Sequence, residues 1–428
     1  MAVTDGALYA SDVLLKYRYL DVFRDQYPLK TTGLRMLKRD NSKVTKDGRG
    51  AQVVWAIRTG RNSGMAAFAD GGLLPRAGKQ IAATGSTTLK NVAGQLQIED
   101  KLIEMSNSMG EASFRNALAD EMKRCAVDFA ANKNRMLYGD RTGILGKVAS
   151  ASDDGTYCTI TLDSTWAGRP VVLTQYFQIG DLLDVLTSAG VDVAPACTVT
   201  AVNASAGTIT VSGTGHDSIA ATNIITKVDA YASATAVEPT GFRNIYSASD
   251  DDLFLNTGNY PIWAGYVRST EEGPTETAME FLRIQGLKKG AKYRGALTTF
   301  GVQAKMVTLI ADQKRAMNTV DYKFGFAGTE DVEALKGPEY AGIGPIVADE
   351  DCPAGTAANS GYLFLIDPTS IKFADAGAPH WMKGDGSILS RIQGYALYEA
   401  TFIEYYDVFC EQRNVCVAHS NLQELSLE

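Results

Sequence analysis

The chain has 428 residues, of which 45% are hydrophobic and 21% are charged. This balance is typical of globular proteins and excludes a wholly disordered chain. A length of roughly three ordinary domains predicts more than one hydrophobic core. With 41 basic and 49 acidic residues the net charge is −8, so overall charge would not hold the protein on nucleic acid.

The N-terminus shows no apolar segment followed by a small-residue cleavage site, so we expect no signal peptide. No stretch reaches the roughly 18 apolar residues of a membrane-spanning helix. The cysteines are dispersed without a Cys-x-x-Cys pair, which indicates free thiols in a reducing cytoplasm. We therefore expect a soluble intracellular protein with six free cysteines: Cys125, Cys158, Cys197, Cys352, Cys410 and Cys416.

A basic stretch follows helical fragments near the N-terminus. Between residues 30 and 61, nine bases oppose only Asp40 and Asp47, a local charge of +7. Such a stretch is typical of an arm that meets an acidic neighbour or nucleic acid, and equally of a solvated face. The sequence leaves both interpretations open.

Alternating apolar residues predict two strands, at 52–58 and 95–98, the second being the return of the first. The residues expected to face inward are Val53, Trp55, Ile57, Leu96 and Ile98. The glycine-rich interval between the strands has no helical period and too few apolar residues for a core. Because so long a loop is usually functional or disordered, we interpret it as an arm that becomes ordered against another molecule.

Residues 109–138 carry the clearest helical pattern. Apolar residues recur there every three, four or seven positions, and Gly139 offers a stop. A helix of this length extends about 44 Å and would act as a strut. The apolar stripe consists of Phe114, Leu118, Met122, Cys125, Phe129 and Met136.

Composition changes between residues 143 and 237, where Thr, Ser, Ala and Val dominate and three bases oppose eight acids. Strand patterns are dense, and 203–207 is typical of a hairpin turn. We predict a small all-β domain inserted after the helix. Its expected strands are 157–162, 197–202, 208–211 and 224–228.

The residues after 237 are predicted to form a mixed α/β region. We predict a helix towards Lys289 that begins with a capping box from Thr277 to Glu280, and a second helix at 302–313. The turn at 411–414 should form a hairpin that places Cys410 opposite Cys416. The predicted strands are 296–300, 362–366, 371–373, 395–410 and 415–418.

Catalytic motifs are absent from the sequence, which has three histidines and no His-Glu-x-x-His or Cys/His ligand set. The stretch 72–80 looks like a phosphate loop, but its glycine spacing is one residue too long and Gln80 replaces the metal-binding hydroxyl. The glycines around His216 precede no helix. We expect solvated loops at the acidic clusters 250–252 and 349–351, which lack calcium-loop spacing, and neither an enzyme nor a cofactor or metal site.

The order of these elements resembles the tailed-bacteriophage major capsid proteins of the HK97 fold. The stretches that carry the resemblance are 60–70, 109–118 with 137–140, 351–356 with 363–368, and 405–410 through 421–422. The similarity implies an α+β fold in six parts. They are the N-terminal arm (1–50), the E-loop hairpin (51–99), the P-domain with its spine helix (100–142), an inserted β-domain (143–237), the A-domain (238–360), and the return strands with the C-terminal end (361–428).

The resemblance also implies a function. The protein would assemble into hexamers and pentamers that form an icosahedral shell around the phage genome, in the virion and, during assembly, in the host bacterial cytoplasm. An encapsulin-type compartment shell with the same fold is the alternative. Implied partners are further copies of the chain, a separate scaffolding protein, a portal protein and double-stranded DNA touched non-specifically on the inner face. A decoration protein is an optional partner, and no membrane is involved.

Two sets of residues are predicted to carry assembly. The spine-helix core would be Phe114, Leu118, Met122, Cys125 and Phe129. The loop at 59–90 would act between subunits, because its few apolar residues cannot offset an ordering cost of roughly 1–2 kcal/mol per residue. We expect no isopeptide crosslink from Lys79 or Lys90. The proposed inter-subunit contacts in and beside the loop are Arg58, Arg61, Met65, Phe68, Leu73, Leu74, Arg76, Lys79 and Ile81.

Overall fold

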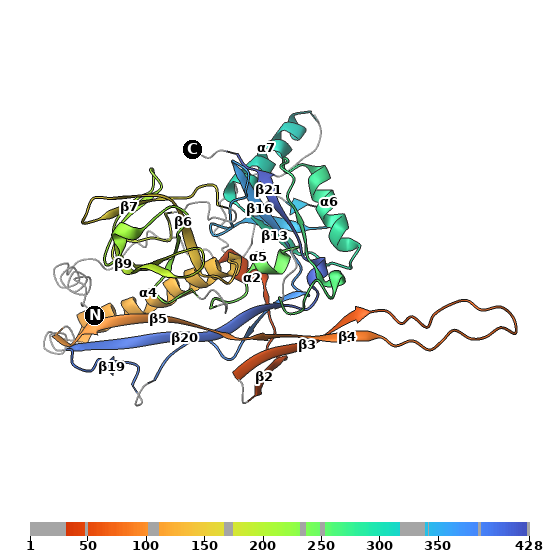
Figure 1. The fold of residues 1–428 in the computed structure, drawn as a ribbon, viewed down its shortest axis with the longest axis horizontal. Coiled ribbons are helices and arrows are strands. Elements are labelled where there is room, and N and C mark those ends of the chain that lie inside the picture. Colours follow the sequence, from red (N-terminus) through yellow and green to blue (C-terminus); the bar gives the residue numbers. More distant parts are fainter. Residues whose placement is uncertain are drawn as a thin grey trace.

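The computed structural model of the chain is a mixed α/β molecule, with four β-sheets and a few helices among the described residues (Figure 1). Among the described residues, no helix is both long and apolar enough to cross a membrane. The structure describes residues 31–47, 50–101, 111–166, 174–231, 237–248, 253–316, 339–340, 342–383 and 387–425.

The longest sheet is built around β20, which pairs antiparallel with β5 over ten residue pairs, from Leu397–Glu99 to Tyr406–Lys90. The sequence-based prediction that 95–98 returns along 52–58 is therefore wrong, because these residues belong to β5 and pair with β20. The sheet order is β1-β17-β20-β18, with β19 and β5 also on β20. The strands are β1 (Lys38–Arg39), β5 (Lys90–Glu99), β17 (Ile371–Asp375), β18 (His380–Trp381), β19 (Ser390–Arg391) and β20 (Leu397–Cys410).

Helix α4 (Glu111–Tyr138) packs on β5 and β20. It ends immediately before Gly139, as the sequence predicts. Phe129 is buried in one cluster with Val92 and Tyr406, and its ring meets the Phe402 ring edge-on at 5.0 Å. Alternation in β5 turns Val92, Leu96 and Ile98 towards the helix, and Met122 and Cys125 pack against the last two. The side chains of Phe114 and Leu118 lie outside the described residues.

A second sheet is a hairpin whose strands are β2 (Val44–Asp47), β3 (Gly50–Gly60) and β4 (Ile81–Thr88). Val53, Trp55 and Ile57 are buried, as their alternation predicts. The return strand is β4, so the loop between the strands is shorter than the 59–90 predicted. The reason is composition: apart from Ile81, β4 is made of small and polar residues, and only Gly85 is buried. Its strand signal is therefore weak, and pairing with β3 supports it.

Six strands between residues 144 and 227 close into a barrel in the order β10-β7-β6-β11-β8-β9 (Figure 1). The predicted hairpin turn is confirmed, since Thr208 of β10 pairs with Asn203 of β9. β6 and β8 were not predicted. The barrel has its own apolar core. Its strands are β6 (Ile144–Asp153), β7 (Cys158–Leu162), β8 (Leu182–Leu186), β9 (Asp192–Asn203), β10 (Thr208–Ser212) and β11 (Ile224–Lys227), with a 3-10 turn η1 (His216–Ser218).

The last sheet runs β12-β21-β16-β13-β15-β14 and is packed by α6 and α7. Helix α6 begins two residues earlier than predicted, because Thr275, not Thr277, caps it by accepting a hydrogen bond from the Ala278 N–H. The strands are β12 (Tyr266–Arg268), β13 (Gly295–Thr298), β14 (Glu339–Tyr340), β15 (Gly344–Ala348), β16 (Ser360–Ile366) and β21 (Val417–Gln423). The helices are α2 (Thr32–Met36), α5 (Phe242–Tyr246), α6 (Glu276–Leu287) and α7 (Phe300–Ala316), with 3-10 turns η2 (Pro261–Trp263) and η3 (Arg413–Val415).

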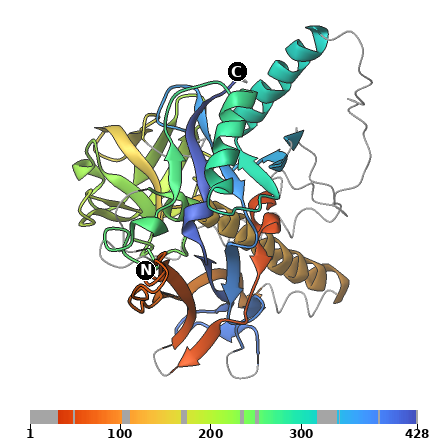
Figure 2. The ribbon, with the colours of Figure 1, turned by 90° about the vertical axis from the view of Figure 1, so that its right-hand side faces the viewer.

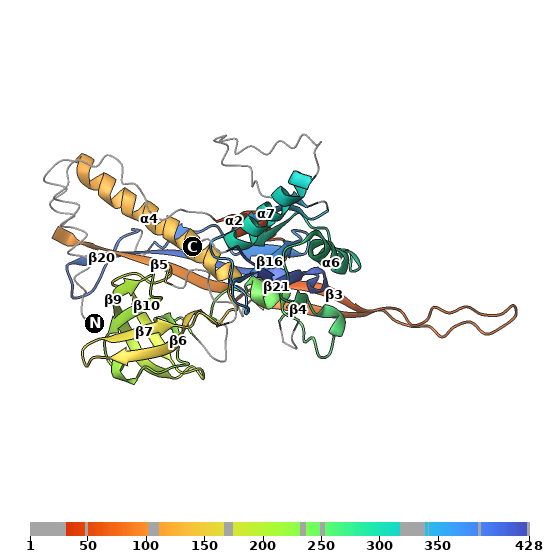
Figure 3. The same ribbon diagram turned by 90° about the horizontal axis from the view of Figure 1, so that it is seen from above.

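The turn at 411–414 does not make the predicted hairpin. β20 and β21 follow one another in the chain but belong to different sheets, so the chain crosses from one sheet to the other at η3. The sulfur atoms of Cys410 and Cys416 nevertheless touch, 3.5 Å apart. Figures 2 and 3 show the barrel and the free end of α4 on opposite sides of β20.

Candidate assembly surfaces

The loop between β3 and β4 forms an arm that extends away from every other part of the described molecule (Figure 1). Four large apolar side chains lie uncovered along it. Leu73 is 97% exposed and Met65 is 82% exposed, while Leu74 and Phe68 are 72% and 58% exposed. Burying one such side chain lowers the free energy by roughly 1.5–3 kcal/mol. Contact with an apolar surface would therefore stabilise the arm.

The two limbs of the arm lie close together next to the hairpin. Within the first limb, the Asn62 side chain accepts a hydrogen bond from the Gly64 N–H at 2.8 Å. A methyl group on Gly64 would lie 2.5 Å from the Gly78 nitrogen, so only glycine allows the limbs to approach this closely. Beyond this point the arm is exposed, and among the described residues no acid pairs with Arg61 or Lys79.

The base of the arm is anchored in the core. The Trp55 ring lies 5.1 Å from the Phe254 ring and 5.2 Å from the Phe409 ring. On the opposite strand, a methyl group on Gly85 would lie 2.8 Å from the Trp55 ring. The base is therefore packed in the core, whereas the tip is exposed. Ile81, predicted as a loop residue, is the first residue of β4 and packs on Gly60, and the predicted contacts Arg58 and Arg76 are exposed.

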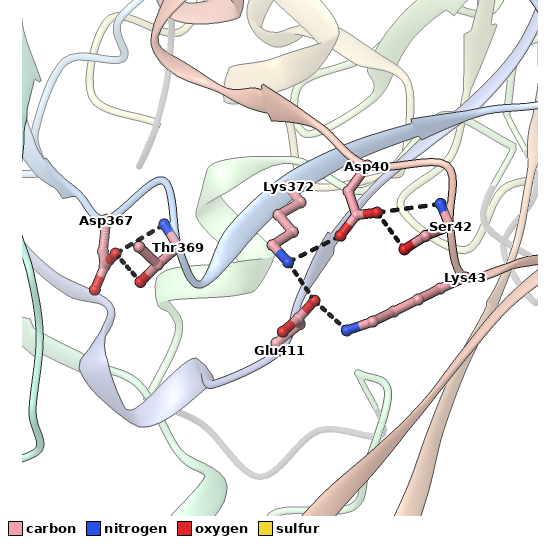
Figure 4. Close-up of polar contacts among 7 residues, drawn as sticks. All are labelled: Asp40, Ser42, Lys43, Asp367, Thr369, Lys372 and Glu411. Atoms are coloured by element: carbon pink, nitrogen blue, oxygen red, sulfur yellow. Dashed lines mark hydrogen bonds and ion pairs between the residues drawn. The ribbon is translucent and has the colours of Figure 1, made fainter.

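Part of the basic N-terminal stretch is neutralised within the chain, an arrangement that the sequence did not predict. The Lys372 ammonium lies between Asp40, at 2.9 Å, and Glu411, at 2.6 Å (Figure 4). Lys43 also pairs with Glu411, and Ser42 donates to Asp40. Arg39 also forms a 2.5 Å ion pair with the buried carboxylate of Asp375. Together these contacts attach the basic stretch to β17 and the end of β20.

A buried ion pair fixes α4 on the long sheet. The Lys133 ammonium lies 2.6 Å from the Glu404 carboxylate, whose side chain is 1% exposed. The same ammonium lies over the Phe373 and Tyr406 rings, at 4.1 and 4.4 Å from their centroids. Burial lowers the pKa of Lys133 and raises the pKa of Glu404, which disfavours both charged forms. Each group is stabilised in its charged form by the opposite charge of its partner.

The barrel joins the body at a buried polar contact. The Tyr176 hydroxyl, between β7 and β8, donates to Asp351 at 2.7 Å. The Asn134 amide of α4 donates to Asp351 at 2.6 Å and to Asp349 at 3.0 Å, and the Gly33 N–H also donates to Asp349. The expectation that 349–351 is a solvated loop is therefore wrong. Burial raises the pKa of Asp351 to about 6 against the hydrogen bonds that lower it. The other cluster, 250–252, lies outside the described residues.

The chain enters and leaves the barrel side by side. A methyl group on Gly143, whose φ is +80°, would lie 2.5 Å from the Ala230 carbonyl oxygen. Arg135 of α4 pairs with Glu238, just after the barrel, and both side chains are nearly buried. The two crossings and the Tyr176 contact together connect the barrel to the body.

The described part of the chain contains no group of three or more His, Cys, Asp and Glu side chains arranged to hold a metal ion. His419 is buried and its ring is satisfied, since it accepts from the Asn421 N–H and lies 2.9 Å from Glu272. The stretch 72–80, which looked like a phosphate loop, runs along the arm and leads into β4 without a helix.

No protein-family model and no curated protein matches the sequence. Solved structures do match: the cyanophage A-1(L) capsid asymmetric unit aligns at a TM-score of 0.55 and 11% identity, over 95% of this chain and 96% of that chain. The chain has a phage capsid fold. The native GTA particle capsid aligns at 0.47 and 12% identity, over 98% and 100% of the two chains. The holo-SrpI encapsulin of Synechococcus elongatus aligns at 0.46 and 8% identity, over 99% and 97%.

Proposed function

We propose that this chain is a major capsid protein that self-assembles into hexamers and pentamers of an icosahedral shell around a phage genome. The capsid fold supports this function. The observation that carries it is the arm between β3 and β4, whose large apolar side chains are exposed although its base is fixed in the core. A surface of this kind is explained by a partner that covers it.

The parts of the HK97 fold map onto the described elements under this proposal. The hairpin of β3 and β4 is the E-loop within 51–99, and α4 is the spine helix of the P-domain, completed by β5, β17 and β20. The sheet around β13, with α6 and α7, belongs to the A-domain of 238–360, and it is completed by β16 and β21, which apart from Ser360 come from 361–428. The segment 1–50 is the N-terminal arm, and 361–428 supplies the return strands.

The barrel corresponds to the insertion at 143–237. Support comes from its separate apolar core and from the close approach of its first and last residues at Gly143 and Ala230. An inserted unit of this kind folds on its own core and can be removed where its ends meet. Replacing 144–229 with a short Gly/Ser linker should leave a soluble chain; wholly insoluble protein, when the arm deletion below is tolerated, would contradict the boundary.

The arm acts as a clasp between subunits. Met65, Phe68, Leu73 and Leu74 dock on apolar surface of a neighbouring copy, while exposed Arg61, Arg76 and Lys79 meet its carboxylates. Exposed ion pairs contribute only about 0–1 kcal/mol each, so the apolar contacts dominate. The spine helix, through Met122, Cys125 and Phe129, packs on the long sheet and stiffens it.

The proposal is tested by substituting the four apolar arm residues with serine. We expect soluble capsomer-sized or smaller particles and no stable shells by sedimentation and electron microscopy. The matched control replaces three alanines of the same loop, Ala66, Ala67 and Ala69, with serine and should still form shells. A deletion of 62–79 that leaves the Gly60–Ile81 pair intact should behave like the first variant. Normal shells from either arm variant would overturn the clasp.

An encapsulin-type shell is the alternative, and the contents of purified particles distinguish it from a phage capsid. Particles purified from their natural source should contain double-stranded DNA if the chain is a phage capsid protein, and protein cargo if it is an encapsulin. The scaffolding, portal and decoration proteins and the DNA contacts on the inner face remain part of this proposal. Co-purification of particles with nuclease-protected DNA tests directly whether the shell is a phage capsid.

A further inference from the structure

Two thiols meet where the chain crosses between sheets. Cys410 is the last residue of β20 and Cys416 directly precedes β21, with η3 between them. Their sulfur atoms lie 3.5 Å apart, and the two residues are 0% and 1% exposed. Among the six cysteines, all of which lie in described residues, no other sulfur–sulfur hydrogen bond is formed.

The backbone between the two cysteines is held from several sides. The guanidinium of buried Arg413 donates to the carbonyl oxygens of Ile245 at 2.9 Å, Asn244 at 2.8 Å and Ser247 at 2.9 Å. The Tyr293 hydroxyl donates to the Val415 carbonyl oxygen at 2.9 Å. The turn therefore has little freedom to separate the sulfur atoms.

We propose that Cys410 and Cys416 are an oxidation site, at which a peroxide converts the touching thiols into an intrachain disulfide that fastens β20 to β21. One thiolate attacks the peroxide, which yields a sulfenic acid and, after protonation, water. The second thiol then displaces water from the sulfenic acid as the S–S bond forms. In total two thiols and one hydrogen peroxide give one disulfide and two waters, and the cysteines are oxidised while the peroxide is reduced.

The geometry requires a small movement. The sulfur atoms must approach from 3.5 Å to the roughly 2.05 Å of a disulfide. Burial, followed by the hydrogen bond with Cys410, raises the pKa of the Cys416 thiol. Thiolate is therefore scarce at neutral pH, so the reaction is slow in the native chain and faster at higher pH. In a reducing compartment the thiols stay free.

The disulfide would link the two sheets where β20 ends and β21 begins. It would restrict the unfolded chain between the last residue of β20 and the residue before β21, which stabilises the folded state. The oxidised protein should therefore unfold at a higher urea concentration than the reduced protein. The proposal concerns the chain itself and does not depend on its proposed role in a shell.

The sequence supplies a direct assay, because Arg413 lies between the cysteines and is the only trypsin site between Arg391 and the C-terminus. Native protein is treated with hydrogen peroxide at pH 7 and pH 9, free thiols are then alkylated in denaturant, and the digest is examined by mass spectrometry. We expect peptides 392–413 and 414–428 to accumulate as one linked species, two hydrogens lighter than their sum, faster at pH 9.

Buried Cys158 and Cys197 in the barrel core are an internal control that needs no variant, since they should stay alkylatable under the same treatment. Cys416→Ser should abolish the linked peptide, and Cys410→Ala provides a second variant if the first fails to fold. Cys410 and Cys416 recovered unlinked, as free thiols or sulfinic acids, would overturn the proposal. Comparable linkage of other cysteine pairs would do so as well.

Discussion

Asp351 makes the joint between barrel and body sensitive to pH. Its carboxylate is largely buried, and desolvation raises its pKa from 3.8 to about 6 although Asn134 and Tyr176 donate hydrogen bonds to it. The buried Asp349 carboxylate opposes the charge and Arg135 favours it. A shift of about two pKa units corresponds to about 3 kcal/mol of free energy.

Because the pKa of Asp351 is raised in the folded protein, the free energy of unfolding depends on pH. The folded protein binds the Asp351 proton more tightly than the unfolded chain does, so this group destabilises the fold above pH 6. The free energy of unfolding therefore rises as pH falls from 7 towards 4, and the gain is complete below the unfolded pKa of 3.8. Asp351→Asn keeps the shape and removes the charge. At pH 7 it should be more stable than wild type by up to about 3 kcal/mol.

Urea unfolding between pH 4 and 8, followed by tryptophan fluorescence, measures this effect. The advantage of Asp351→Asn should shrink as the pH falls and vanish near pH 4. Glu350→Gln, at an exposed neighbouring position, is the matched control and should follow wild type at every pH. If the difference between Asp351→Asn and wild type is independent of pH, the buried-charge explanation of this joint is refuted.

Lys133→Met leaves the buried Glu404 carboxylate unpaired and should lower the free energy of unfolding by about 3–5 kcal/mol, whereas adding Glu404→Leu should recover most of the loss in the same denaturation assay. Failure of the second substitution to rescue would contradict the ion-pair account. Gly85→Ala pushes a methyl group against the Trp55 ring and should cost about 1–3 kcal/mol. Gly377→Ala meets nothing within 4 Å and should stay within about 0.5 kcal/mol of wild type by thermal unfolding; equal effects would refute the packing argument.

Local sequence determined the features that depend on neighbouring residues. The helical period and the glycine stop placed the end of α4 at Tyr138, and the 203–207 turn placed the β9–β10 hairpin. Alternation correctly assigned Val53, Trp55 and Ile57 to one buried face. These signals are local because side-chain period and turn chemistry act over a few residues.

Tertiary structure decided which strands pair and which polar groups are buried. Alternation shows which face of a strand is covered but not which strand lies beside it, so β5 was assigned to β3 although it pairs with β20. Asp351 looked like a solvated residue because its donors, Asn134 and Tyr176, are distant in the chain. The Cys410–Cys416 contact was predicted from a hairpin that does not form, and packing between two sheets produces it instead. Each of these features depends on contacts between distant segments, which no local pattern records.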